Sequence, residues 1–490
     1  MRAIFLTILL MGIIVVGEAQ SCDCKKCFDY LVNKIKVDYP GYNDKVTEKT
    51  KSQLLQLEQD LRMKIKQYPD SCGTYLSTYT SWFKDNHLRI RRVWRNRSEE
   101  SDSKGNEKYF VGNIDSTLQL TENRDSVVGL WHSFWGDIAI VKSADSESYL
   151  GVSISYDRYE KNQIVFSMKQ ILENEFAVTS YPYYYNFEPE EGEASFRLNK
   201  QVLELHDNTR FVKKTNSPIA DDAFLYSYFP EFPNGANVYP IALALTDSTF
   251  YLRVPSFYDS TAIEFTLKHW DEITSRPNLI IDIRNNGGGQ DNYFSTLTDL
   301  IYNRPYESKG VEWYASKNNI ALFEDALKNG EISNGEEGIE WTNALLEVMR
   351  KNVGGFVIHP LMGSDKTIVN DTIYPMPRRI GIIINEGNAS SAEQFILEAK
   401  NSSKTILFGN CNTAGVLDYS NAVSETLPGG EFELVYPMTR SRRLPEQPID
   451  NVGIAPDVYI PYSSSMQLFD RLDQWVYFVK AYLELMSVEK

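Results

Sequence analysis

Beyond about Asp222 the sequence alternates short apolar runs typical of strands with amphipathic runs typical of helices, and this alternation constrains the fold more than any other feature. The predicted strands span residues 249–254, 278–283, 379–384 and 405–409, and the predicted helices span residues 260–274, 293–302 and 391–400. Strands that alternate with helices in this way form largely parallel sheets covered by helices. Residues 222–490 are therefore predicted to form an α/β core.

The rest of the chain divides into two regions of different character. Apolar side chains recur at helical spacing from residue 27 to residue 66, and a further helix is predicted over residues 72–83, which together indicate a helical N-terminal region, residues 20–106. Short alternating runs separated by polar turns then predict a mostly antiparallel β barrel or sandwich, residues 107–221. The predicted fold class is thus a multidomain α/β (α+β) protein, and 490 residues suffice for it.

The N-terminus has the pattern of a secretory signal. Arg2 precedes the apolar run 4–16, and small residues stand at positions 17 and 19 before polar sequence begins. This pattern predicts a signal peptide over residues 1–19 and an exported mature chain, which would be periplasmic, extracellular or on the outer surface. A lipid anchor at Cys22 is disfavoured because the residues before it are a poor acylation motif. No other run approaches the roughly 20 apolar residues that a membrane-spanning helix needs.

Charge and cysteine content limit the partners of the chain. The formal net charge is -16, and only the stretch 89–97 is locally basic, so no nucleic-acid partner is expected. Export permits disulfides, and Cys72 can pair with one of the N-terminal cysteines, which leaves an odd thiol. The spacing does not suit a zinc knuckle, and neither metal nor organic cofactor is expected. The five cysteines are Cys22, Cys24, Cys27, Cys72 and Cys411.

A glycine-rich loop follows the predicted strand 278–283. Residues 285–289 read Asn-Asn-Gly-Gly-Gly, so successive backbone N–H groups are not covered by side chains and positive φ is allowed. Glycines after a strand often make only a tight turn, and a phosphate-binding loop would need a lysine and a serine or threonine that are missing here. We interpret the loop as an oxyanion-binding site.

Ser390 stands between a sharp polar turn and the predicted helix 391–400. At a helix N-terminus, uncovered amides and the macrodipole favour the anion that forms when a serine attacks an acyl substrate. The structural alternative is that Ser390 is an N-cap and that Glu393 completes a capping box. A nucleophilic serine also needs a base. Among five histidines, His87 lies between a predicted helix and the strand-like run 88–93, and catalytic residues tend to lie at such junctions.

Three motifs occur in a characteristic order: the strand and glycine loop 278–289, the Ser390-x-x-Glu393 turn, and the tail 449–457, which reads Ile-Asp-Asn-Val-Gly-Ile-Ala-Pro-Asp. In order and spacing they resemble the C-terminal processing and tricorn family of serine peptidases. The resemblance implies a crotonase-like αββ core and acyl transfer on peptide bonds, with Ser390 as the nucleophile.

The same resemblance implies an oxyanion hole made by the backbone N–H groups of Gly288 and Ser391, with Gly287 as an alternative to Gly288. It also bears on the base. One branch of the family carries a lysine in a Thr-x-Gly-Lys context after the serine, but residues 413–416 here read Thr-Ala-Gly-Val.

The tricorn-like branch instead uses a histidine from the N-terminal region, and Asp85-Asn86-His87 resembles its Asp-Gly-His segment. Asn86 takes the place of the glycine, and asparagine also tolerates left-handed backbone. The resemblance therefore implies His87 as the general base.

The acid that orients His87 has two candidates. The acidic residue of the family lies just before the tail motif, which corresponds to Asp450. A carboxylate there would hold the imidazole tautomer and stabilise the imidazolium. Asp418, two residues beyond the missing lysine and on the same strand face, is the alternative. No PDZ-like segment is visible between His87 and the core.

The sequence thus predicts an exported serine-type endopeptidase that acts on peptide or protein substrates through an acyl-enzyme on Ser390. The alternative is a non-catalytic ligand- or peptide-binding protein on the same fold, since folds are shared by proteins of different function. Retention of both Ser390 and His87 argues against it. A third hypothesis gives the β-rich region a glycan- or envelope-binding role.

Overall fold

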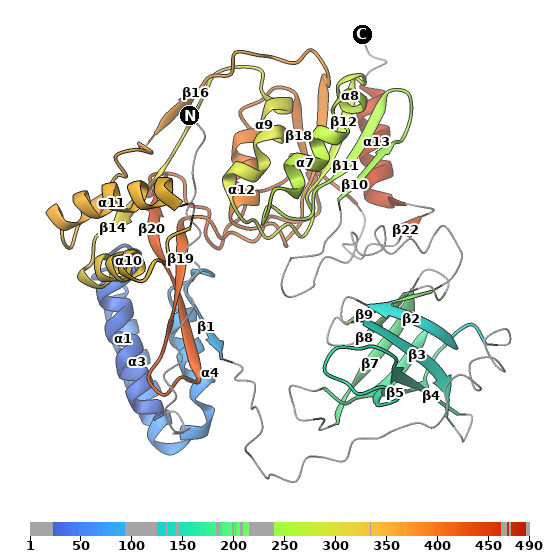
Figure 1. The fold of residues 1–490 in the computed structure, drawn as a ribbon, viewed down its shortest axis with the longest axis horizontal. Helices are drawn as coiled ribbons and strands as arrows, with labels where there is room; N and C mark the ends of the chain where they lie inside the picture. Colours follow the sequence, from blue (N-terminus) through green and yellow to red (C-terminus); the bar gives the residue numbers. More distant parts are fainter. Residues whose placement is uncertain are drawn as a thin grey trace. The chain divides into compact units, whose positions relative to one another are not determined.

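The structure is a computed structural model, and it describes residues 23–93, 125–133, 136–143, 147–182, 187, 189–197, 200, 202–205, 209–214, 240–333, 335–363, 365–461, 468–469 and 472–486. The chain divides into two compact units (Figure 1). Unit 1 comprises residues 1–96, 246–250 and 256–459, and unit 2 comprises residues 97–245, 251–255 and 460–490. The predicted signal peptide, Cys22 and the boundaries predicted near residues 106 and 221 lie outside the described residues.

Helices form the N-terminal region, as the apolar spacing predicts. They are α1 (Cys24–Asp38), α2 (Tyr42–Lys45), α3 (Lys51–Gln67), the 3-10 turn η1 (Pro69–Ser71) and α4 (Cys72–Ser81). Asp23 caps α1 by accepting the N–H of Lys26 at 3.2 Å, and the helix ends just before Pro40, which cannot continue it.

A disulfide between Cys24 and Cys72 joins the start of α1 to the start of α4. It confirms that Cys72 pairs with one of the N-terminal cysteines. Cys411 is a free thiol, as the odd number of cysteines requires.

A five-stranded sheet in unit 1 pairs a strand of the N-terminal region with strands from the second half of the chain. Its order is β1-β20-β14-β15, and β19 pairs with β20. The strands are β1 (Arg89–Arg92), β14 (Val311–Tyr314), β15 (Phe356–Val357), β19 (Tyr419–Thr426) and β20 (Phe432–Ser441). β1 runs antiparallel to β20, with Ile90 opposite Leu434. This pairing fixes the segment that precedes β1, and therefore His87, beside a strand from near the C-terminus.

One hydrophobic core underlies this sheet. Buried side chains of α1, α3, α4, β19 and β20 pack in a single cluster with those of α10 (Lys317–Asn329) and α11 (Gly335–Lys351). Phe28, Leu76 and Leu434 are completely buried within it. The N-terminal helices are consequently part of the same folded body as the strands that carry the C-terminal motifs.

The second sheet has the order β10-β11-β12-β17-β18-β21. Its strands are β10 (Ile241–Ala244), β11 (Thr249–Arg253), β12 (Asn278–Asp282), β17 (Arg379–Ile383), β18 (Thr405–Gly409) and β21 (Val458–Tyr459). β12, β17, β18 and β21 pair in parallel, which confirms the predicted parallel sheet. Both β12 and β17 are buried, so their carboxyl ends deliver the glycine loop and the Ser390 turn to the same edge of the sheet.

Helices connect these strands, as the alternation predicts. They are α7 (Thr261–Lys268), α8 (Trp270–Thr274), the 3-10 turn η4 (Asp291–Phe294), α9 (Ser295–Ile301) and α12 (Ser391–Ala399). The rings of Phe257, Phe294 and Phe395 lie 5.5–5.9 Å apart and pack η4 against α12. The remaining elements are β13 (Tyr306–Ser308), β16 (Lys366–Ile368), β22 (Leu468–Phe469), β23 (Leu472–Asp473) and α13 (Gln474–Leu485).

The β-rich region is a closed antiparallel barrel rather than a sandwich. Its strands are β2 (Gly129–Ser133), β3 (Gly136–Lys142), β4 (Ser148–Ser153), β5 (Ile164–Gln170), β6 (Glu175–Ser180), β7 (Glu190–Arg197), β8 (Val202–Leu205) and β9 (Arg210–Lys213). Each strand pairs with the next and β2 pairs with β9. Trp131, Phe166, Phe176 and other apolar side chains form one buried cluster in it. A small eight-stranded barrel of this kind is filled by its own side chains.

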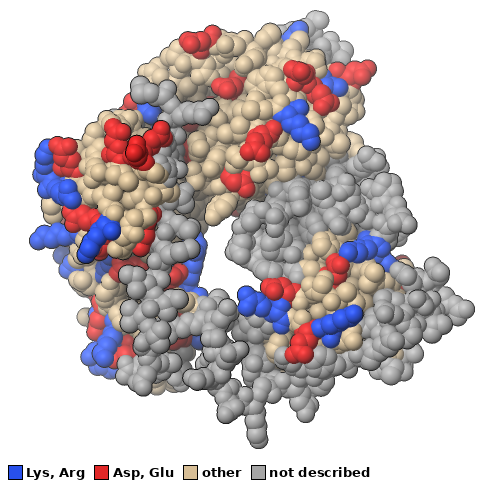
Figure 2. Space-filling view, viewed as in Figure 1, with Lys and Arg blue, Asp and Glu red and all other residues tan. Residues whose placement is uncertain are grey.

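On the face drawn in Figure 2, the described Lys and Arg side chains lie among Asp and Glu side chains rather than in a continuous band. Examples are the ion pairs Arg350–Glu324 and Lys351–Glu347 on α10 and α11. A search of the described helices finds none with the length and apolar character needed to cross a membrane.

Candidate active site

Ser390 has a backbone conformation that serine rarely adopts. Its φ is 55° and its ψ is -124°, immediately before the first residue of α12. A residue other than glycine costs about 1–3 kcal/mol in such a region and persists only where its surroundings impose it. Ser390 stands at the N-cap position of α12, but its side chain makes no capping hydrogen bond. The prediction that this side chain caps the helix is therefore wrong.

The glycine loop lies directly against Ser390. A Cβ atom added to Gly288, which has φ +96°, would come within 2.9 Å of the Ser390 Cβ and 2.8 Å of the Ser391 N. At Gly289 the added atom would lie 2.0 Å from the carbonyl oxygen of Phe257, whereas at Gly287 it would meet nothing within 4 Å. Gly288 and Gly289 are therefore required by close approach, and the structure brings Gly288, Ser390 and Ser391 together.

Asparagine side chains hold this loop and the serine turn in register. Asn385 accepts the N–H of Asn285 at 2.8 Å and donates to the Asn285 Oδ1 at 2.7 Å. Asn388 donates to the carbonyl oxygen of Ile283. The N–H of Ala389 donates to the carbonyl oxygen of Asn286 at 3.2 Å. The ends of β12 and β17 are consequently tied by polar contacts as well as by their strand pairing.

The N–H of Gly288, predicted to be an oxyanion donor, is engaged in this structure. It donates to the Asn286 Oδ1 at 2.9 Å. Among the described contacts none engages the N–H of Gly287. A substrate anion would therefore either replace the Asn286 oxygen at Gly288 or use Gly287, so both assignments stay open.

His87 lies in a tight turn before β1. Its N–H donates to the Asp85 Oδ1 at 2.8 Å, and the other oxygen of Asp85 accepts the Tyr39 hydroxyl at 2.8 Å. Lys84 rather than Asn86 has the positive φ of this turn, 49°, so the expectation attached to Asn86 is wrong. Burial and the charge of Arg89 lower the pKa of His87 below its ordinary value, which Asp85 opposes. Nδ1 is buried without a hydrogen-bond partner among the described residues.

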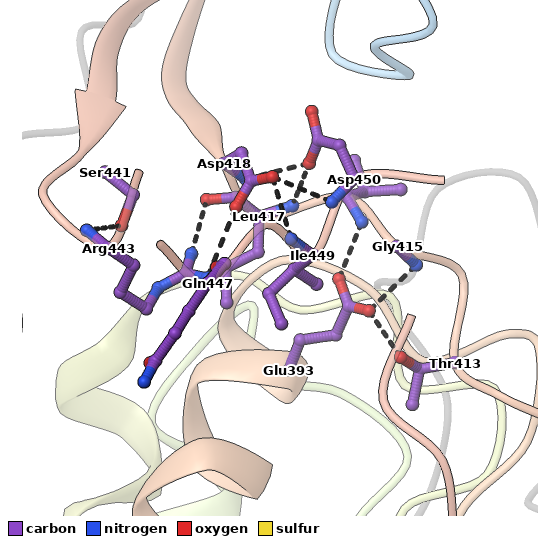
Figure 3. Close-up of polar contacts among 11 residues, drawn as sticks. Glu393, Thr413, Gly415, Leu417, Asp418, Ser441, Arg443, Gln447, Ile449 and Asp450 are labelled. Carbon is purple, nitrogen blue, oxygen red and sulfur yellow. Dashed lines mark hydrogen bonds and ion pairs between the residues drawn. The ribbon is translucent and has the colours of Figure 1, made fainter. Parts of the chain in front are cut away.

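Asp450 occupies a turn that contacts the His87 segment. Figure 3 shows one carboxylate oxygen directed at the 417–418 backbone and the other pointing away. Oδ1 accepts the N–H groups of Leu417 at 2.9 Å and Asp418 at 2.8 Å, while Oδ2 is buried and has no partner in the described part of the chain. The next residue, Asn451, donates to the carbonyl oxygen of Lys84. Burial, together with the negative charge of Asp85, raises the pKa of Asp450 to about 7.

Asp418, the alternative acid, is occupied by other groups. Its Oδ2 accepts the N–H groups of Ile449 at 2.8 Å and Asp450 at 2.9 Å, and its Oδ1 lies 3.2 Å from an Arg443 guanidinium nitrogen. Each carboxylate therefore keeps one oxygen without a hydrogen-bond donor in the described structure, but that of Asp418 is ion-paired with Arg443, whereas that of Asp450 is not.

A cavity of about 530 Å³ opens beside these carboxylates. Asp418, Asp450, Trp82 and Tyr419 are among its lining residues, and Ser390 is not. Within the described residues, no cluster of three or more His, Cys, Asp or Glu side chains could hold a metal ion.

Contacts join the predicted residues in two groups. Gly288, Ser390 and Ser391 form one group, and Asp450 and the His87 turn form the other. In the described structure no hydrogen bond joins the His87 ring to Ser390 or to Asp450, and the roles of these residues stay predictions. Sequence reasoning missed the asparagines and Arg443, and it gave Glu393 no role beyond the motif and the alternative of a capping box. The only indication of these residues in the sequence is that they are polar residues within otherwise apolar motifs.

Comparison with known proteins identifies this region. Residues 248–460 match peptidase family S41. No curated protein sequence matches the chain significantly. Mature CPAF has a TM-score of 0.49 and 14% identity, over 95% of this chain and 98% of that chain. The photosystem II D1 C-terminal processing protease has a TM-score of 0.35 and 12% identity, over 90% and 94%. The tricorn protease has a TM-score of 0.38 and 12% identity, over 95% and 37%.

The family match covers the glycine loop, Ser390 and Asp450, and it confirms the resemblance that the motifs carry. A peptidase acts on peptide substrates. Residues 248–460 therefore match peptidase family S41, and this match supports a serine peptidase.

Proposed function

We propose that this protein is an exported serine endopeptidase in which Ser390 is the nucleophile, His87 the general base and Asp450 the acid that orients it. The observation that carries the proposal is the positive φ of Ser390 at the start of α12, against Gly288. A sharp strand-to-helix turn of this kind exposes the hydroxyl of a nucleophile. A serine with only a structural role has no need of so costly a conformation.

In the proposed reaction the Ser390 Oγ attacks the carbonyl carbon of the peptide bond while its proton passes to His87. The resulting oxyanion is held by the Ser391 N–H and by Gly288 or Gly287. Collapse of this intermediate breaks the C–N bond, and His87 returns the proton to the leaving amine. Water, deprotonated by His87, then hydrolyses the acyl-enzyme and frees Ser390.

The contacts of His87 and Asp450 are compatible with these roles. Each has one buried polar atom without a described partner, Nδ1 and Oδ2, and buried polar atoms normally find partners. Hydrogen bonds between catalytic groups often tighten only when substrate binds. Export is supported by the sequence of residues 1–19 and by the disulfide between Cys24 and Cys72, since disulfides persist in oxidising compartments.

Labelling with a fluorophosphonate tests the proposal. The purified protein should take up one label, located by peptide mass mapping at Ser390, and Ser390→Ala should take up none. His87→Ala should label about 100- to 10,000-fold more slowly because the general base is lost. The same mass measurement reports the N-terminus, expected at Gln20 after export.

His269→Ala is the matched control for loss of a histidine. The His269 Nδ1 lies 2.9 Å from a Glu272 oxygen in the turn between α7 and α8, and we expect labelling at the wild-type rate. A label on a residue other than Ser390, or a His87→Ala protein that labels as fast as wild type, would falsify the mechanism.

A further inference from the structure

The loop 413–418 lies between helix α12 and the tail that carries Asp450. On the helix side its anchor is Glu393, which is completely buried. The Glu393 carboxylate accepts the N–H of Gly415 at 2.8 Å, the N–H of Val416 at 2.7 Å and the hydroxyl of Thr413 (Figure 3). Hydrogen bonds to an ionised acceptor are stronger than neutral ones, so one side chain fixes most of the loop.

On the tail side the same loop is packed against residues 449–454. Thr413 makes two hydrogen bonds with the backbone of Ile454: its N–H donates to the Ile454 carbonyl oxygen at 3.1 Å, and its hydroxyl accepts the Ile454 N–H at 2.8 Å. Gly415 has φ +71°, and an added Cβ would lie 2.8 Å from the Asn451 N. The Thr413 hydroxyl consequently bridges Glu393 to the tail.

The loop also contacts two of the three predicted catalytic residues, Ser390 and Asp450, through its backbone. The Val416 carbonyl oxygen accepts the N–H of Ser390 at 3.0 Å. The next two residues, Leu417 and Asp418, donate their N–H groups to Asp450. One short segment therefore sets the strained backbone of the nucleophile and the carboxylate of the acid, and Glu393 holds that segment.

We propose that Glu393 is a positioning residue: through its contacts with Thr413, Gly415 and Val416 it sets Ser390 and Asp450 relative to each other. The inference rests on the proposed function, because the relative position of Ser390 and Asp450 affects the reaction only if both residues are catalytic. Without the carboxylate, two buried N–H groups and a hydroxyl lose their acceptor, and the loop must move to find others. A misplacement of about 1 Å at reacting groups costs about 100-fold in rate.

The test is Glu393→Gln, measured by the concentration dependence of fluorophosphonate labelling, which separates the maximal rate, kinact, from the binding constant, KI. The amide keeps the shape of the side chain, but it presents N–H groups to donors. We expect kinact to fall about 100-fold, with KI changed less than about threefold. Thr413→Val, which removes the bridging hydroxyl, should act in the same direction, and Thr413→Ser should recover most of the rate.

Glu398→Gln is the matched control on the same helix. The Glu398 carboxylate accepts the Tyr306 hydroxyl at 2.9 Å and lies 3.3 Å from the Gln394 amide, so its loss perturbs α12 without touching the loop. We expect this variant to keep kinact within about threefold of wild type, with thermal unfolding recorded for every variant.

The outcomes separate the two proposals. Failure of the wild-type protein to label at Ser390 refutes the proposed function and is seen before any variant is made. If the wild type labels, then a wild-type kinact in Glu393→Gln, an equal loss in Glu398→Gln, or equal rates for Thr413→Val and Thr413→Ser would overturn the positioning role.

Discussion

Two other carboxylates, Asp85 and Asp418, lie near enough to Asp450 to affect its pKa. Burial and the carboxylate of Asp85 raise its pKa to about 7, whereas burial lowers the pKa of His87. On the proposed assignment, His87 therefore loses its proton at a lower pH than Asp450 does, and ionisation of Asp450 controls whether the imidazolium can be stabilised.

We predict that the labelling rate of Ser390 rises with pH up to about 7 and then levels. Below that pH, Asp450 is protonated and offers the imidazolium no charge. In Asp450→Asn this rise of the labelling rate with pH should disappear, and the rate at pH 8 should fall about 100-fold or more. The measurement is kinact between pH 5 and pH 9. If the labelling rate of the variant still rises with pH as in the wild type, the ionisation belongs to another group.

The same substitution should change stability in the opposite direction. Because the pKa of Asp450 is higher in the folded protein than its ordinary value in an unfolded chain, its contribution to stability is present at low pH and is lost as the pH rises through 7. Asn retains an acceptor for the two N–H groups and removes the buried charge. Urea unfolding at pH 8 should therefore show Asp450→Asn more stable than wild type, on the order of 1–3 kcal/mol, with a smaller difference at pH 4.

The roles of single residues were predictable where the residues belong to a motif, and unpredictable where the roles depend on residues far away in the sequence. The motif order led to Ser390 and Asp450, and the structure places Gly288 against that serine. For Glu393 the sequence offered only a local alternative, the capping box, because its partners at 413–416 are near only after folding. The left-handed backbone expected at Asn86 occurs at Lys84 instead. This could not be predicted, because lysine has no particular preference for left-handed backbone.

The glycine loop illustrates the element scale, because its shape depends on how closely two strand ends approach. The ends of β12 and β17 converge, and the three glycines are not equivalent there: Gly288 meets the Ser390 turn, while Gly287 faces open space. Backbone proximity rather than chain flexibility distinguishes them.

We predict that Gly288→Ala and Gly287→Ala differ sharply. Alanine at 288 would need φ +96° and would collide with the Ala389 carbonyl oxygen at 2.7 Å, so the serine turn must shift and labelling should fall about 100-fold. Alanine at 287 keeps the N–H and meets no atom within 4 Å, so at most a few-fold loss is expected. Equal losses in kinact would show that the loop is not held as described.

Elements with a single strong pattern were predicted well. The buried strands β12, β17 and β18 and helix α12 lie within a residue of their predicted bounds. The long strand β20 was missed because Pro437 interrupts it and its alternation is weak, so only pairing with β1, β14 and β19 defines it. The predicted helix 260–274 is two helices, α7 and α8, which meet at His269.

For the whole molecule, folding of unit 1 depends on contacts between regions far apart in the sequence. Composition and pattern predicted helical, β-rich and α/β regions. They did not indicate that the N-terminal helices share a core with β19 and β20. That association is made by tertiary packing, which leaves no periodic signal along the chain.

We predict that the disulfide between Cys24 and Cys72 stabilises unit 1. It spans 48 residues, for which chain entropy gives about 4 kcal/mol. The double variant Cys24→Ala, Cys72→Ala should unfold at lower urea concentration, and labelling of Ser390 should be lost in the same transition. Cys411→Ala, which removes only a free thiol, should unfold like wild type. Coincident curves for all three proteins would contradict the prediction.

The antiparallel pairing of β1 with β20 also has a consequence for the timing of activity during synthesis. A chain emerging from the ribosome presents the His87 segment long before its partner strand and Asp450. On the proposed assignment, a nascent chain that has not yet reached β20 and Asp450 holds no assembled triad. The cell would thereby be shielded from the proposed activity until both segments have been synthesised.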